Sequence, residues 1–147
     1  MKRVVAAAML LLLTGCGGGH SAAEKRSAAK KRFIAQADAR CQSFNHRLAV
    51  LEPLFRSDQA AAAKEAMPDF ESLLAYLHSL SAPSGDSDLS EILAGYDQIH
   101  ADLRAVVAAK ARDDQVVIQR KFDDLEAKQK LLAPKAFAYG FKVCGQL

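Results

Sequence analysis

Three cysteines stand in settings that favour different chemistry, and Cys16 has the most distinctive one. It lies in residues 13–19 (LTGCGGG), directly after an apolar run and before three glycines. A deprotonated cysteine thiol is a strong nucleophile. The small Thr14 and Gly15 before it let a protease reach the chain, and the glycines after it keep the chain flexible. The setting therefore places a nucleophile on an accessible and flexible stretch of chain.

The segment that precedes Cys16 has the organisation of an export signal. Lys2 and Arg3 are positively charged, and residues 4–13 (VVAAAMLLLL) are uninterruptedly apolar. This run is too short to cross a bilayer, which takes about 20 apolar residues in a helix. With Cys16 it resembles the lipobox of bacterial lipoproteins, whose cysteine receives a diacylglyceryl group. The resemblance implies a signal peptide over residues 1–15, lipid such as palmitate attached at Cys16, and anchoring to the outer face of the cell membrane.

A conventional signal peptide with an incidental cysteine is the alternative for this segment. Two or three acyl chains hold a protein stably at a membrane, so lipid at Cys16 alone would suffice as an anchor.

The other two cysteines, Cys41 and Cys144, are predicted to form a disulfide. Once Cys16 carries lipid they are the only pair left, in a chain exported to a compartment where disulfides persist. Cys41 lies on the apolar face of an expected helix. Cys144 follows an expected helix end at Gly140, on a short tail that can fold back. Two buried free thiols in a reducing compartment are the alternative.

The histidines give only a weak indication of metal chemistry. Asp97 and His100 have a spacing that resembles the ligand pair of di-iron bundles, but the pattern occurs once. His46, His78 and His100 each fall beside an expected apolar stripe. A metal- or haem-binding bundle would need these rings to face inward, so no metal site and no cofactor is predicted.

Catalytic residues are not predicted either. The chain has no G-x-S-x-G or S-x-x-K motif and no phosphate-binding glycine loop. The acidic pairs 113–114 and 123–124 point in different directions on a helix and are interpreted as solvated. Tyr76, Tyr96 and Tyr139 are interpreted as core side chains. A cavity between helices, opened by bends in the helices, is the alternative for the tyrosines.

The residues discussed above are expected to be positioned by helices, because the sequence has helical periodicity. Apolar side chains recur at spacings of three and four over residues 34–55, 57–80, 89–112 and 114–139. Pro68 and Pro134 are expected to start, bend or break helices. Between the second and third segments, residues 81–87 (SAPSGDS) form an expected loop, with Asp86 or Ser87 as the cap of the next helix. Gly140 is an expected C-cap.

This pattern, with no strand signal of useful length, predicts an all-α fold. Four helices of similar length joined by short turns favour an antiparallel four-helix bundle. Three long helices crossed by a short one are the alternative.

The charge of the chain is concentrated near its start. Residues 1–15, the expected signal peptide, hold Lys2 and Arg3 and no acidic residue. After their removal, 18 of the 20 basic residues and all 17 acidic residues remain, so the rest of the chain has a net charge of +1. A strongly basic, nucleic-acid-binding domain is therefore not expected.

Residues 21–32 (SAAEKRSAAKKR) hold five basic residues against one acid. Residues 16–32 are interpreted as the lipid anchor with a flexible basic tether that favours anionic headgroups, and residues 33–147 as one helical domain. A solvated first turn of a helix is the alternative for the basic segment.

Three fragments carry a further resemblance. They are Asp38–Cys41 (DARC), Leu80–Asp86 (LSAPSGD) and Tyr139–Gly145 (YGFKVCG). Together they resemble a group of small, uncharacterised lipoproteins from high-GC Gram-positive bacteria. The resemblance implies an exported helical domain and assigns no activity.

The sequence therefore favours a membrane-anchored, extracytoplasmic binding or adaptor module that is not an enzyme. Its expected partners are the membrane, through the lipid, and an unidentified protein or small molecule. Nucleic acid is not among them. A metal- or haem-binding bundle and an envelope enzyme are the alternatives.

Overall fold

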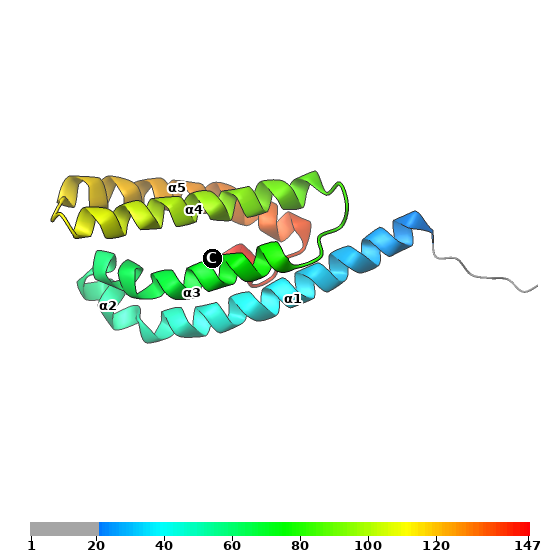
Figure 1. The fold of residues 1–147 in the computed structure, drawn as a ribbon, viewed down its shortest axis with the longest axis horizontal. Coiled ribbons are helices and arrows are strands. Elements are labelled where there is room, and N and C mark those ends of the chain that lie inside the picture. The colour runs from blue at the N-terminus through cyan, green and yellow to red at the C-terminus, as the bar shows by residue number, and fades with distance from the viewer. Residues whose placement is uncertain (1–20) are drawn as a thin grey trace, which may run out of the picture.

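The computed structural model describes residues 21–147, and within that range the protein is built from helices (Figure 1). The elements are α1 (Ala22–Val50), α2 (Glu52–Ser57), α3 (Gln59–Ser79), α4 (Ser87–Lys110), α5 (Gln115–Tyr139) and a 3-10 turn, η1 (Cys144–Gln146). No strand occurs among the described residues. The prediction of an all-α fold is confirmed. The expected signal peptide and Cys16 lie outside the described residues.

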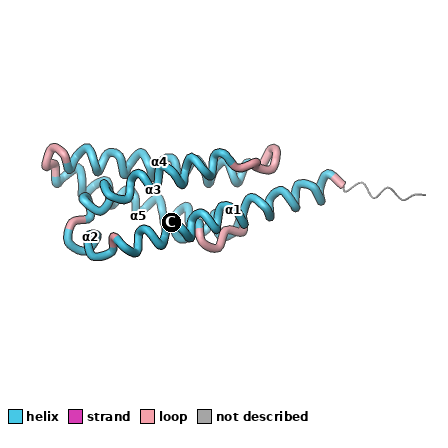
Figure 2. The backbone as a smooth tube through the Cα atoms, turned by 60° about the horizontal axis from the view of Figure 1, so that its bottom comes forward, coloured by secondary structure: helices cyan, strands magenta, loops and turns pink. Residues whose placement is uncertain are grey.

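Four long helices form an antiparallel bundle. α1, α3, α4 and α5 alternate in direction, and the short α2 turns the corner between α1 and α3 (Figures 1 and 2). The main contacts run from α1 to α3, from α3 to α4 and from α4 to α5. The segment that contains η1 contacts both α5 and α1. The bundle therefore closes through its C-terminal segment, and the second segment of the chain is a long helix rather than a short crossing one.

The start of α1 corrects the expected tether. Ser21 caps the helix: its Oγ accepts the N–H of Glu24 at 3.2 Å, and its own N–H donates to Glu24 Oε2 at 2.7 Å. This reciprocal capping box satisfies two backbone donors and starts a regular helix. Residues 21–28 are all exposed, and α1 projects beyond the other helices (Figure 1). A flexible tether over residues 22–32 was therefore the wrong expectation; residues 16–20 lie outside the described range.

The first apolar segment also ends earlier than its periodicity predicts. α1 stops at Val50, and Leu51 serves as its C-cap and as the N-cap of α2. Pro53 occupies the first turn of α2, where a proline is tolerated because its missing N–H would lack a helical partner. In an uninterrupted helix the ring of Pro53 would clash with a carbonyl of the preceding turn. By contrast, Pro68 and Pro134 lie within α3 and α5 and end neither helix.

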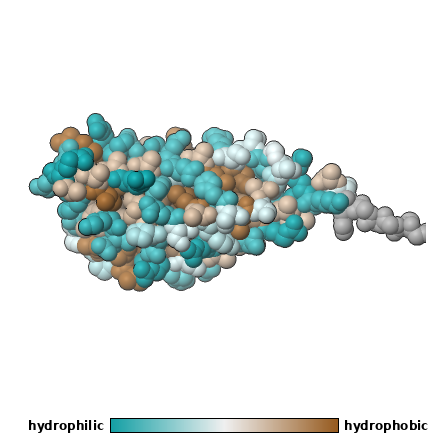
Figure 3. Space-filling model, viewed as in Figure 1, coloured by the Kyte–Doolittle hydropathy of each residue, from teal (hydrophilic) through white to brown (hydrophobic). Residues whose placement is uncertain are grey.

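The core lies between the two layers formed by α4 with α5 and by α3 with α1. The predicted apolar stripes of the four long helices supply most of it, and Phe33 adds a ring that the stripe of α1 did not include. The largest side chains that are fully buried are Tyr96, Phe33, Leu73, Leu77, Leu89, Ile92, Val106, Cys41 and Cys144. On the surface, hydrophobic side chains show mainly along the seam between α4 and α3 and at the end near α2 (Figure 3).

Candidate functional site

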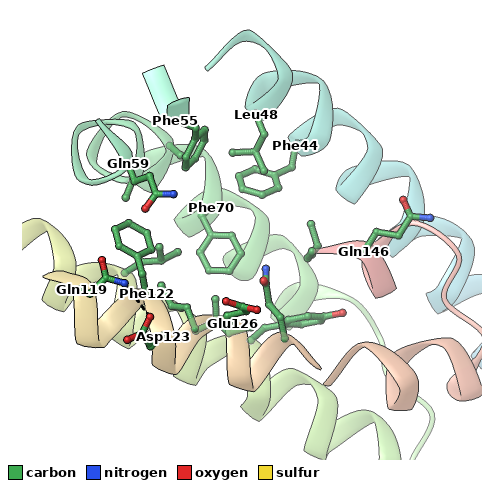
Figure 4. A pocket seen from close by; sticks show the side chains of 18 residues that line it. Phe44, Leu48, Phe55, Gln59, Phe70, Gln119, Phe122, Asp123, Glu126 and Gln146 are labelled. Carbon is green, nitrogen blue, oxygen red and sulfur yellow. Dashed lines mark hydrogen bonds between the residues drawn. The ribbon is translucent and has the colours of Figure 1, made fainter. Parts of the chain in front are cut away.

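A cavity of about 500 Å³ opens inside the bundle near the α2 end. Its apolar walls come from all five α-helices: Phe44 lies on α1, Phe55 on α2, Phe70 on α3, Ile99 on α4 and Phe122 on α5. The rings of Phe44 and Phe70 pack with centroids 5.5 Å apart. Figure 4 shows Phe55 and Phe122 reaching into the cavity from opposite sides, toward Phe70. Ligand cavities in proteins have this size and this largely apolar, aromatic lining.

Polar side chains stand around the apolar part of the cavity. α5 contributes most of them, because positions three and four apart lie on one face of a helix. Gln119, Asp123, Glu126 and Gln129 lie on that face. Gln59 adds an amide from α3. The amides of Gln59 and Gln129 make no hydrogen bond to another described residue, so they can bind a ligand.

The C-terminal segment supplies one wall, through Gln146 and Leu147. Cys144 fixes this segment to α1 by a disulfide with Cys41, with Cα atoms 5.3 Å apart. That separation lies in the usual range for a bridged pair, 4.4 to 6.8 Å. The structure thus places the two cysteines at disulfide distance, as predicted, and both side chains are buried.

Asp38 holds the same segment from one turn earlier on α1. Its Oδ2 accepts the N–H of Lys142, and its Oδ1 accepts those of Val143 and Cys144, each at 2.9 Å. Residues three apart on a helix share a face, so the carboxylate and the disulfide act on the same stretch of chain. The fragment Asp38–Cys41, noted in the sequence as part of a resemblance, is therefore a two-point attachment.

Two of the tyrosines on the apolar stripes also fasten the C-terminal end. Tyr96 donates its hydroxyl hydrogen to the carbonyl of Cys144 at 2.8 Å, and burial raises its pKa. Tyr139 donates to Asp86 Oδ2 at 2.8 Å. Burial and this hydrogen bond raise the pKa of Tyr139. Lys30 stacks over the Tyr139 ring, 3.8 Å from its centroid. The interpretation of these two tyrosines as core side chains agrees with their burial, although Tyr96 also lines the cavity.

His46, His78 and His100 do not converge on one point. His78 pairs with Asp97 at 2.9 Å and His100 pairs with Glu71 at 3.2 Å, both between α3 and α4. Asp97 and His100 therefore bind different partners, and His46 is exposed. Among residues 21–147, no three His, Cys, Asp or Glu side chains gather as metal ligands.

Asp102 is a buried carboxylate that the sequence did not single out. Its side chain is 8% exposed and accepts hydrogen bonds from Lys121, at 2.9 Å, and from Lys128. Burial alone would raise its pKa, but the hydrogen bonds from Lys128 and Lys121 lower it below the usual value. Asp102 is therefore a charged link between α4 and α5, because both of its partners lie on α5.

The sequence missed the polar side of the cavity. The acidic pair 123–124 was interpreted as solvated, and Asp123 is indeed exposed. In the structure, Asp123 lines the cavity while Asp124 pairs with Lys121 at 3.2 Å. The weak signal was the spacing of four, three and three positions that places two amides and two carboxylates on one helical face, at Gln119, Asp123, Glu126 and Gln129.

Comparison with protein-family models, curated protein sequences and solved structures finds no match to this chain. None of the helices within residues 21–147 has both the length and the apolar character needed to cross a membrane.

Proposed function

We propose that the protein is a lipid-anchored, extracytoplasmic binding module and that it holds a small, largely apolar molecule in the cavity between its helices. The observation that carries the proposal is the cavity itself. It has a volume of about 500 Å³, phenylalanines on four helices and a border of amides and carboxylates. The Cys41–Cys144 disulfide agrees with an exported protein, because such bonds persist mainly outside the reducing cytosol.

Filling the cavity is expected to weaken ligand binding. Ala66 lies on α3, lines the cavity and is 7% exposed. In Ala66→Leu the added carbons displace about two ligand methylenes, each contributing about 0.8 kcal/mol. The affinity for a neutral probe, decyl glucoside below its critical micelle concentration, should fall about tenfold in isothermal titration calorimetry.

Ala75→Leu is the matched control, because Ala75 lies on the same helix and is exposed. It should bind decyl glucoside as the native protein does. If the native protein shows no saturable binding of this probe, or if both variants bind equally, the cavity is not a ligand site.

Anchoring is expected to depend on Cys16. The lipobox-like residues before it and the glycines after it mark one cleavage and acylation point. Replacing Cys16 by alanine should leave an uncleaved precursor or release the protein from membranes, as seen by fractionation and mass spectrometry. A Cys16→Ala variant that still matures and stays with the membrane would contradict the anchoring proposal.

A further inference from the structure

From the charges that surround the cavity, we infer that its ligand is a cationic amphiphile, with an apolar chain and an ammonium-type head. This inference rests on the proposed function and names the ligand class of the same site. Within residues 21–147, the carboxylates of Asp123 and Glu126 line the cavity, and no Lys, Arg or His side chain does so. A positive head is therefore attracted at the border, while a carboxylate or sulfate head is repelled.

Asp123 has an oxygen to spare for such a ligand. Gln119 donates to its Oδ1 at 3.0 Å. No hydrogen bond from another described residue reaches Oδ2. In Figure 4, Asp123 and Glu126 lie on the same side of the cavity, along α5 and next to Phe122.

Glu126 is already paired, but with a partner that a ligand can replace. Lys130 donates to its Oε1 at 2.5 Å, and this hydrogen bond lowers the pKa of Glu126, which keeps the carboxylate charged. The side chains of Lys130 and Glu126 are 72% and 66% exposed. Exposed pairs of this kind contribute little free energy, because water screens them. A ligand ammonium group can therefore take the place of Lys130.

The aromatic walls favour the same class of ligand. A cation is attracted to the face of an aromatic ring within about 6 Å of its centroid. Phe44, Phe55, Phe70 and Phe122 line one cavity, and Tyr96 adds a fifth ring. These rings accept an apolar chain and also tolerate a quaternary ammonium head, whereas a hydrated anion gains nothing from them.

The test compares three probes with the same ten-carbon chain, all below their critical micelle concentrations: decyltrimethylammonium, decyl glucoside and decyl sulfate. Isothermal titration calorimetry on the native protein should give the cation about tenfold tighter binding than the sulfate, with the glucoside between them. The preference should shrink as salt is added, because the carboxylates are exposed.

The double variant Asp123→Asn/Glu126→Gln should lose most of this preference and keep its affinity for decyl glucoside. The matched control Asp88→Asn/Glu91→Gln removes two carboxylates at the start of α4, outside the cavity lining, and should keep the preference.

If decyl glucoside binds and responds to Ala66→Leu but the three heads bind equally, or the sulfate binds best, the ligand class is wrong and the proposed function stands. If the control pair abolishes the preference as fully as the cavity pair, the preference comes from net charge and the inference is also wrong. If none of the three probes binds, both proposals fail together.

Discussion

Replacing Cys41 and Cys144 together by alanine is expected to lower the free energy of unfolding by about 2 to 5 kcal/mol. The two residues are 103 positions apart in sequence, so the disulfide closes most of the described chain into a loop and restricts the unfolded state. Urea unfolding of the double variant beside the native protein measures the loss.

The reducing agent dithiothreitol provides the control for the disulfide. It should destabilise the native protein by about the same amount and leave the Cys41→Ala/Cys144→Ala variant unchanged. If the native protein, denatured without reductant, alkylates freely at both Cys41 and Cys144, the bond is not formed in the protein. A loss that dithiothreitol does not reproduce would point to packing of the two side chains instead.

Asp38→Ala is expected to lower the free energy of unfolding by about 3 kcal/mol. The substitution removes the acceptor of three backbone N–H groups, those of Lys142, Val143 and Cys144. Hydrogen bonds to a charged group contribute about 1.5 to 3 kcal/mol each when buried, and the first of these three is exposed, so their sum is discounted. The measurement is urea unfolding with the disulfide intact.

Two variants make the Asp38 result specific. Asp38→Asn keeps a carbonyl oxygen for Val143 and Cys144, but it loses the acceptor of the Lys142 N–H and the negative charge that strengthens the other two hydrogen bonds. Asp38→Asn should therefore lower the free energy of unfolding by about half as much as Asp38→Ala. Asp69→Ala removes a carboxylate that accepts from the exposed Arg47 and should cost less than about 1 kcal/mol. A loss in Asp38→Ala no larger than that in Asp69→Ala would show that the carboxylate does not hold the C-terminal segment.

Most of the helical architecture could be predicted because local signals and packing agree. Asp86 and Asp114 cap the starts of α4 and α5, and each accepts the N–H of a residue three positions on at 3.1 Å. Gly140 ends α5 with a positive φ of 120°, a conformation that favours glycine. At Asp86 and Gly140 the sequence predicts both the element and its boundary.

The two ends of α1 were predicted wrongly because, at each end, only one sequence signal was considered. The apolar spacing from Ile34 to Phe55 runs through Pro53, and the backbone, not the spacing, decides that a helix must be interrupted there. At the other end, the basic character of residues 21–32 suggested a tether, while Ser21 and Glu24 already had the spacing of a capping box.

The cavity could not be predicted in the same way. Its polar side chains come from three separate segments of the chain: α3, α5 and the C-terminal segment. Gln59, Gln119 and Gln146 line one cavity only after the bundle closes, so no local sequence pattern indicates that they share it. Asp102 was missed for a related reason, because its two lysine partners lie 19 and 26 residues away.

The capped, exposed start of α1 couples the orientation of this helix to the orientation of the whole bundle. A flexible segment would leave the orientation of the bundle independent of this segment, but a helix keeps a fixed length and direction. At 1.5 Å per residue, the exposed residues 22–28 form a rod about 10 Å long that is continuous with the part of α1 holding Asp38 and Cys41. Tilting that rod turns the whole bundle, so the mouth of the cavity keeps a fixed direction relative to the exposed start of α1.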